Sequence, residues 1–105
     1  MEEQFKKIFR KEDESGLKEK HVPVIEVEEE NKEVKINVKV GSVEHPSELA
    51  HFIQWIEILD GEISLEKIYL SPFSKSRAVF FVKEMPEDLK VRIFCNLHGT
   101  WENEK

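Results

Sequence analysis

The stretch that decides the fold is VKINVKVG, residues 34 to 41, in which valine or isoleucine occupies every second position. Charged or polar residues fill the positions between them, and Gly41 ends the run. Because successive side chains of a β-strand point to opposite faces of the sheet, this period of two predicts a strand with one buried face. The preceding run, residues 24–28, alternates in part, and residues 30–32 form the turn of a predicted hairpin.

Four more short segments rich in β-branched and aromatic residues follow, with turn residues such as Asp60-Gly61 and Ser71-Pro72 between them. These predicted strands are residues 52–59, 63–70, 78–82 and 90–95. About six short strands and no long helix predict an all-β fold, an immunoglobulin-like antiparallel β-sandwich. A small barrel is the alternative architecture. Trp55, in the middle of its strand, is expected to fill the space between the sheets.

The N-terminal segment has a different period. Phe5, Ile8 and Phe9 recur at helical spacing within residues 2–12, which predicts a short amphipathic helix that ends before Ser15-Gly16. We therefore expect residues 1–105 to form a single domain in which residues 1–16 are a short N-terminal helical arm. This arm has two interpretations: a contact between subunits, or a segment folded on its own domain or frayed.

Composition limits the classes of function. The chain has 105 residues, 39% of them hydrophobic, which suffices for one compact core but not for a deep cavity. A formal net charge of -6 argues against a nucleic-acid or anionic-membrane partner. The sequence has neither a run of about 20 apolar residues nor the apolar core of a signal peptide, so we expect a cytoplasmic protein. A single cysteine excludes an internal disulfide.

The candidate metal ligands are the four histidines and the one cysteine, all at predicted strand ends or loops. Cys95 and His98 form a Cys-x-x-His pair, His45 and His51 flank the segment Pro-Ser-Glu-Leu-Ala, and His21 precedes Pro23 by two residues. Each of these residues alone is weak evidence for a metal site, because exposed loop histidines are common and a Cys-x-x-His pair can arise by chance. Together, the thiolate and imidazole donors could turn toward one metal ion.

Three segments resemble one family, the superoxide reductases, also called neelaredoxins and the catalytic domain of desulfoferrodoxins. EKHVPVI at residues 19–25 looks like the family's first motif. Residues 41–56 read like G-x-x-x-HP-x-x-x-x-HFI-x-WI, and residues 95–102 look like CNLHG-x-WE. The resemblance spans residues 17–103, in the same order and with the same internal spacings.

The resemblance implies an immunoglobulin-like fold with one iron ion per chain that cycles between Fe2+ and Fe3+. The implied equatorial ligands are four imidazoles and the axial ligand is a thiolate: His21, His45, His51 and His98 with Cys95. The implied reaction is superoxide reductase activity, in which superoxide, one electron and two protons give hydrogen peroxide. The anionic sulfur would favour reduction by donating electron density to the iron.

The resemblance also assigns roles to two charged residues and to partners. Lys20 would attract superoxide and support protonation, and Glu19 would cap the ferric site. A rubredoxin-like electron donor and a homodimer or homotetramer are implied. Two alternatives stay open: both charges are ordinary solvated surface groups, or the chain is a non-catalytic immunoglobulin-like module that binds zinc or an electron-transfer iron.

Overall fold

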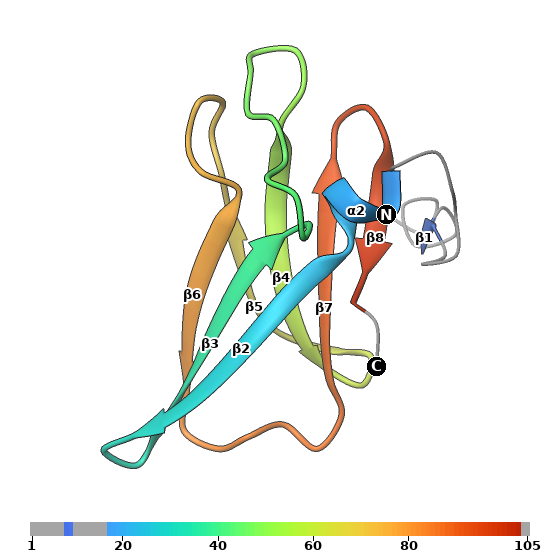
Figure 1. The fold of residues 1–105 in the computed structure, drawn as a ribbon. Helices are drawn as coiled ribbons and strands as arrows, with labels where there is room; N and C mark the ends of the chain where they lie inside the picture. Colours follow the sequence, from blue (N-terminus) through green and yellow to red (C-terminus); the bar gives the residue numbers. More distant parts are fainter. Residues whose placement is uncertain (1–7, 10–16, 104–105) are drawn as a thin grey trace.

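The computed structural model describes residues 8–9 and 17–103, which form two β-sheets packed face to face (Figure 1). The five-stranded sheet has the order β1-β8-β7-β4-β5, and the three-stranded sheet has the order β2-β3-β6. In chain order the elements are β1 (Ile8–Phe9), α2 (Leu17–His21), β2 (Pro23–Glu30), β3 (Glu33–Val40), β4 (Ile53–Asp60), β5 (Ile63–Tyr69), β6 (Arg77–Val82), β7 (Leu89–Cys95) and β8 (Gly99–Glu102).

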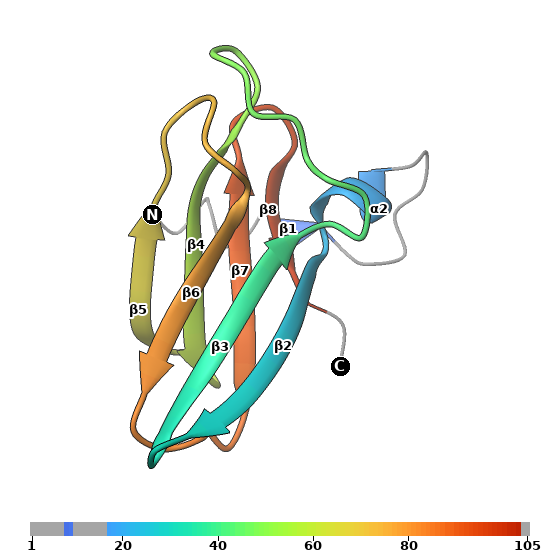
Figure 2. The ribbon, with the colours of Figure 1, turned by 60° about the vertical axis from the view of Figure 1, so that its left-hand side comes forward.

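The predicted all-β, immunoglobulin-like antiparallel sandwich is confirmed. Adjacent strands pair antiparallel throughout the described residues, except that β1 runs parallel to β8. The expected hairpin joins β2 to β3 through Asn31 and Lys32, whose φ angles of 49° and 65° are those of a tight turn. Since the two sheets are separate layers, the fold is a sandwich and not the small barrel (Figure 2).

The predicted N-terminal helix falls mostly outside the described residues. Of residues 2–12, only Ile8 and Phe9 are described, and they form strand β1 and not a helix. Their backbone partners are Thr100 and Trp101 on β8, at the edge of the five-stranded sheet. The short helix α2, which the sequence analysis did not predict, is the helical element of the described chain.

The core lies between the sheets and follows the period of two. Val34, Ile36, Val38 and Val40 of β3 are at most 3% exposed, which confirms the buried face predicted from residues 34–41. Complete burial of such a side chain contributes about 1.5–3 kcal/mol. The other core residues come mainly from the strands facing β3: Val22, Ile53, Ile56, Ile58, Ala78, Phe80, Val91, Ile93, Cys95 and Trp101.

The two tryptophans have different environments. Trp55 was expected between the sheets, but it is not part of the core cluster. A register shift between Ile53 and Trp55 changes the face that this part of β4 presents. Trp55 instead stacks on Phe94, with ring centroids 5.9 Å apart, and the Lys67 ammonium lies 4.2 Å from its ring. Trp101, which is fully buried, supplies the aromatic bulk of the core.

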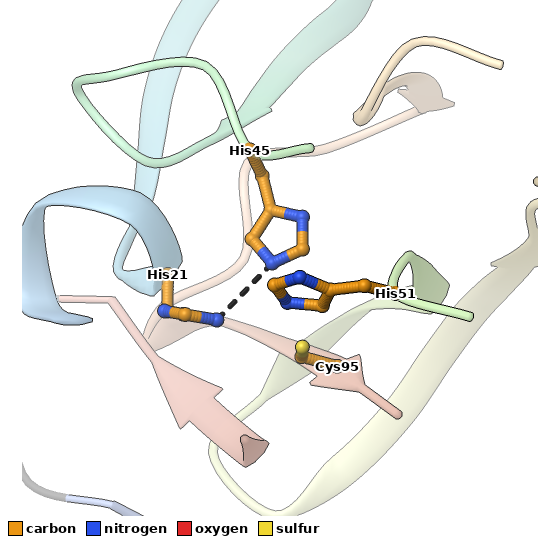
Figure 3. A group of neighbouring side chains, drawn as sticks. All are labelled: His21, His45, His51 and Cys95. Atoms are coloured by element: carbon orange, nitrogen blue, oxygen red, sulfur yellow. Dashed lines mark hydrogen bonds between the residues drawn. The ribbon is translucent and has the colours of Figure 1, made fainter. Parts of the chain in front are cut away.

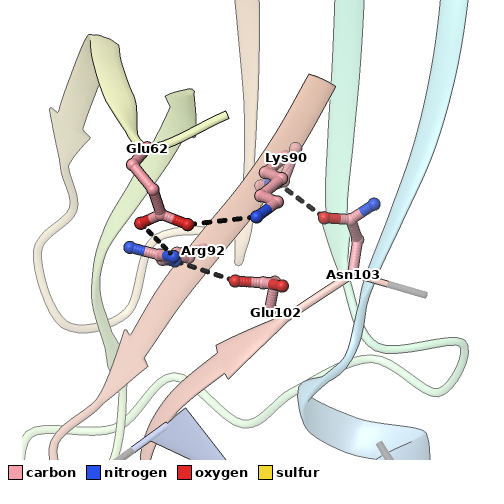
Figure 4. Close-up of polar contacts among 6 residues, drawn as sticks. Glu62, Lys90, Arg92, Glu102 and Asn103 are labelled. Carbon is pink, nitrogen blue, oxygen red and sulfur yellow. Dashed lines mark hydrogen bonds and ion pairs between the residues drawn. The ribbon is translucent and has the colours of Figure 1, made fainter. Parts of the chain in front are cut away.

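The outer face of the five-stranded sheet carries an ion-pair network around Arg92 of β7 (Figure 4). Its guanidinium donates to Glu102 on β8 at 2.9 Å and to Glu62 in the β4–β5 turn at 3.0 Å. Lys90 donates to the other oxygen of Glu62 at 3.1 Å. These contacts connect three segments at the end of the sandwich where β4 turns into β5.

The other end of the sandwich gathers the segments that carry the candidate ligands. Helix α2, the loop from residue 41 to residue 52 and the β7–β8 turn lie together there, opposite the β2–β3 hairpin (Figures 1 and 2). In the part of the chain that the structure describes, no helix has both the length and the apolar composition to cross a membrane.

Candidate metal centre

His21 is the last residue of α2 and is fully buried. The chain turns into β2 directly after it, and the Val22 carbonyl accepts a hydrogen bond from Gly41 N at 3.1 Å. The imidazole therefore points inward at the end of the sandwich. The Trp101 indole stacks on it at a centroid distance of 5.0 Å and an interplanar angle of 19°.

The loop after β3 fits closely against the backbone just before His21. Gly41 has a φ of 83°, and a Cβ atom there would lie 2.6–2.7 Å from Val43 O, Glu19 O and Lys20 C. The Val43 amide donates to the Glu19 carbonyl at 3.1 Å. Only glycine fits such a close approach at this backbone angle, so Gly41 fixes the segment that ends in His21.

His45 lies in the 41–52 loop and is 2% exposed. Its Nδ1 lies 2.6 Å from the Pro46 carbonyl, and because a carbonyl can only accept, Nδ1 carries the proton. Nε2 of the neutral ring then has a lone pair, and it lies 3.1 Å from His21 Nε2 (Figure 3). A backbone carbonyl that orients an imidazole in this way is typical of histidine metal ligands.

His51 lies at the other end of the same loop. Its backbone pairs with that of Glu48 through two hydrogen bonds, with N to O distances of 2.8 and 3.0 Å, so residues 48–51 form a tight turn. Its Nε2 is buried and makes no hydrogen bond with any described residue. A buried polar nitrogen without a hydrogen bond is costly unless another partner satisfies it. A metal ion held by the cluster would be such a partner.

Cys95 ends β7 and is fully buried. Backbone N–H groups of Leu97 and His98 donate to its sulfur. His98, three residues on, places Nδ1 3.8 Å from the Cys95 sulfur and 3.2 Å from His21 Nε2. The turn between β7 and β8 thus brings a thiol and an imidazole to the same point from one short segment.

The structure brings all five sequence-predicted ligands together, although they come from three separate segments. The donor atoms of His21, His45, His51 and Cys95 all lie within 4.8 Å of one another (Figure 3). His98 joins this group through its contacts with His21 and Cys95. Four imidazole nitrogens and one sulfur around one point are a donor set suited to a first-row transition metal.

Burial sets the protonation of the cluster. Desolvation lowers the pKa of His45 from 6.5 to about 4, against the opposing effect of the Pro46 hydrogen bond. Desolvation also lowers the pKa of His51, with a further contribution from the charge of His98. Neutral imidazole is the form that binds metal, so these two residues are ready to bind near neutral pH. Burial raises the pKa of the Cys95 thiol, and the Leu97 and His98 N–H groups oppose that shift.

Lys20 and Glu19, the two predicted catalytic residues, are both exposed in α2 immediately before His21. The positive charge of Lys20 lowers the pKa of both His45 and His51, so its ammonium lies within electrostatic range of the cluster. The Glu19 backbone carbonyl is held by Val43 N and by Ser42 Oγ at 3.4 Å.

Three residues support the ligands through contacts that the sequence analysis did not predict: Trp101 contacts two ligands directly, and Gly41 and Asn96 contact the chain neighbours of His21 and His51. Gly41 was interpreted as the end of a strand and the start of a motif, and Trp101 only as part of a motif. The backbone N–H groups of Asn96 and Leu97 were expected to contact the Cys95 sulfur, but the Asn96 N–H donates to Phe52 O. Trp101 Nε1 donates to the His98 carbonyl at 3.0 Å, in addition to stacking on His21. All three residues lie within the motif segments, so the sequence marked them as part of the motifs. Their contacts with other segments cannot be derived from the spacing of residues along the chain.

The fold and the cluster together define a β-sandwich with a mononuclear His/Cys site that can hold a metal ion. The family model described as desulfoferrodoxin matches residues 13–104. The chain therefore belongs to the desulfoferrodoxin family, as the three motifs predicted.

Relatives and solved structures agree with this assignment. A desulfoferrodoxin of Syntrophotalea carbinolica is 51% identical over 89 residues, 85% of this chain and 65% of that protein. A superoxide reductase of Pyrococcus horikoshii is 41% identical over 99 residues, 82% of this chain and 85% of that protein. The structure of a superoxide reductase from Nanoarchaeum equitans superposes with a TM-score of 0.70 at 31% identity, covering 82% of this chain and 91% of that one. The chain spans 62–65% of the length of the first curated relatives.

Proposed function

We propose that this chain is a superoxide reductase, which reduces superoxide to hydrogen peroxide with one electron and two protons. The observation that carries the proposal is the convergence of four histidines and one cysteine at one end of the sandwich. The named relatives and solved structures are superoxide reductases and desulfoferrodoxins, which supports the same activity.

The proposed cofactor is one iron ion per chain, held by the five ligands predicted from the sequence: His21, His45, His51, His98 and Cys95. Imidazole suits ferrous iron, and a structural zinc site normally takes four ligands, whereas this cluster offers five. When bound, the iron would supply the one-electron reduction of superoxide. The Leu97 and His98 N–H groups would lower the electron density on the Cys95 sulfur and so tune the potential of the site.

Lys20 is proposed as the residue that draws superoxide toward the cluster. Its positive charge acts on His45 and His51, and the protein as a whole is strongly acidic, so a local cation is needed to attract an anion. As a proton-bearing group beside the cluster, Lys20 would also support protonation of the product. Glu19 is proposed to cap the oxidised site, because a carboxylate suits ferric iron.

The partners follow from the family resemblance alone. A rubredoxin-like protein is proposed as electron donor, and the proposed assembly is a homodimer or homotetramer. The proposed location is the cytoplasm.

Metal analysis together with visible spectra tests the proposal. Protein purified without air should contain about one iron per chain and gain a thiolate-to-ferric absorption band on oxidation. Cys95→Ser should remove that band. Stoichiometric zinc, with no band after anaerobic loading with iron, would overturn the proposal in favour of a structural metal site. Iron without peroxide formation would favour a non-catalytic electron-transfer module.

A further inference from the structure

The turn that carries His51 is closed on itself. Glu48 and His51 exchange two backbone hydrogen bonds of 2.8 and 3.0 Å. Leu49, at its tip, is 73% exposed. These bonds fix the shape of the turn, but they do not fix its position relative to β7, where the Cys95 thiol lies.

Asn96 connects this turn to the β7–β8 segment on both sides of His51. Its backbone N–H donates to Phe52 O at 3.2 Å, and its side-chain Oδ1 accepts from Phe52 N at 2.9 Å. Its side-chain Nδ2 donates to Ala50 O at 2.9 Å. Ala50 and Phe52 are the immediate neighbours of His51, so three hydrogen bonds bracket that residue.

The chemistry of this contact requires an amide side chain. The Phe52 N–H can only donate and the Ala50 carbonyl can only accept, so the partner must present an acceptor and a donor at once. Aspartate keeps the acceptor but loses the donor, and alanine loses both. Asparagine is the residue of this length that satisfies both neighbours of His51.

The His51 ring makes its own contacts with other candidate ligands. Its Nε2 makes no hydrogen bond with the described residues, and its ring is placed against His45 and His98 at centroid distances of 4.8 and 5.1 Å. Since Asn96 directly follows Cys95, it holds the backbone of His51 at a fixed distance from the thiol. We propose that Asn96 is a positioning residue that sets the location of His51 relative to Cys95 and thereby determines metal affinity.

The inference rests on the proposed function only in requiring that the cluster binds a metal ion. Asn103 provides a matched control at the opposite end of β7 (Figure 4). Its Oδ1 accepts from Val91 N at 2.7 Å and its own N–H donates to Val91 O at 3.1 Å, the same pair of bonds that Asn96 forms with Phe52. Replacing each with alanine removes the side-chain acceptor of one backbone N–H, once beside the cluster and once away from it, and Asn96→Ala removes the bond to Ala50 O as well.

The test is anaerobic titration of the metal-free 105-residue protein with Co²⁺, followed through the absorption band between the thiolate and the bound cobalt. Asn96→Ala should raise the dissociation constant about 10- to 100-fold, as is typical when the residue supporting a ligand is lost. Asn96→Asp, which keeps the bond from Phe52 N, should have a smaller effect. Asn103→Ala should leave the dissociation constant unchanged, even where it lowers the melting temperature as much as Asn96→Ala does.

A double-mutant cycle separates positioning from general support. In a His51→Ala background, Asn96→Ala should cause no further loss of Co²⁺ affinity, because the ligand that it positions is gone. An undiminished effect in that background, or equal affinities of Asn96→Ala and the unmodified protein, would overturn the inference while leaving the proposed function intact. Absence of Co²⁺ binding by the unmodified protein would overturn the metal centre and the inference together.

Discussion

The indole of Trp101 and the imidazole of His21 lie nearly parallel, with ring centroids 5.0 Å apart. The same indole donates from Nε1 to the His98 carbonyl at 3.0 Å. One core residue therefore contacts two candidate ligands from segments that lie far apart in the sequence. The hydrophobic core and the cluster are consequently not independent.

Trp101→Phe keeps an aromatic ring beside His21 but removes the hydrogen bond to His98. The free energy of unfolding of the metal-free protein should fall by about 1–3 kcal/mol, because the partly buried His98 carbonyl loses its donor and the smaller ring leaves a void. Urea denaturation measures this. Trp55→Phe, outside the core cluster, is the comparison, and an equal loss in both variants would contradict a special role for Trp101.

Gly41→Ala should disturb the cluster through the backbone of Glu19 and Lys20. Gly61 is the matched control: its φ is also positive, at 62°, but the nearest atom to an added Cβ is Asp88 Oδ2 at 3.8 Å. Both variants pay the left-handed backbone penalty of about 1 kcal/mol. Gly41→Ala should cost about 1–3 kcal/mol more because its Cβ overlaps backbone atoms.

The two glycine variants should also differ in their affinity for a metal ion. Co²⁺ affinity should fall in Gly41→Ala and stay unchanged in Gly61→Ala, since only the former displaces the segment ending in His21. Urea denaturation and Co²⁺ titration of both variants measure the two effects. Equal losses of stability and of affinity in both would show that the close approach around Gly41 does not position the ligands.

Local patterns in the sequence predicted some strands of this fold, whereas contacts between distant segments were not predicted. The strand at residues 34–41 was predictable because one of its faces is buried along its whole length. Strand β8 has only four residues, which is too short to show a periodic pattern. The pairing of β1 with β8 joins Ile8 to Thr100, two residues more than 90 positions apart in the sequence.

The side on which Trp55 lies could not be predicted either, because the register shift that determines it has no recognisable pattern in the sequence. The four histidines and one cysteine were candidates because the chain has so few of these residues, and their assignment as one ligand set followed from the resemblance of the three motifs to the superoxide reductases. The support that Gly41, Asn96 and Trp101 give them was not found, because it depends on tertiary contacts across several segments.

The stability of the metal-free protein should depend on pH through His45. Its folded-state pKa is about 4, against 6.5 when unfolded, so between these values the unfolded chain binds a proton that the folded protein excludes. The free energy of unfolding should therefore be highest above pH 6.5 and fall by about 2–3 kcal/mol as the pH drops to 4. His51, whose pKa is also lowered, acts in the same direction.

Urea denaturation of metal-free protein between pH 7.5 and 4.5, roughly the range over which a histidine of ordinary pKa titrates, measures this dependence. His45→Gln, which cannot take up a proton there, should show a smaller slope. Identical slopes for this variant and the unmodified protein would mean that burial of His45 does not control the acid sensitivity.

Lys20→Ala should slow the reaction with superoxide several-fold at low ionic strength and weaken its dependence on salt, because a positive charge that acts on His45 and His51 is lost. Lys83→Ala is the control. Lys83 lies beside the β2–β3 hairpin, at the opposite end of the sandwich, and its loss changes the net charge equally. Stopped-flow or pulse-radiolysis rates at several salt concentrations measure the effect. Equal slowing by both substitutions would show that only the net charge of the protein matters and would contradict a local role of Lys20.

The central claim is that the five-ligand cluster reduces superoxide and does not dismutate it. The most direct measurement is the yield of hydrogen peroxide when iron-loaded, fully reduced protein meets a limiting amount of superoxide. We predict one peroxide for each superoxide consumed, with oxidation of one iron and no release of dioxygen. A yield of one peroxide for every two superoxide ions, with dioxygen released and the iron still reduced, would contradict the account.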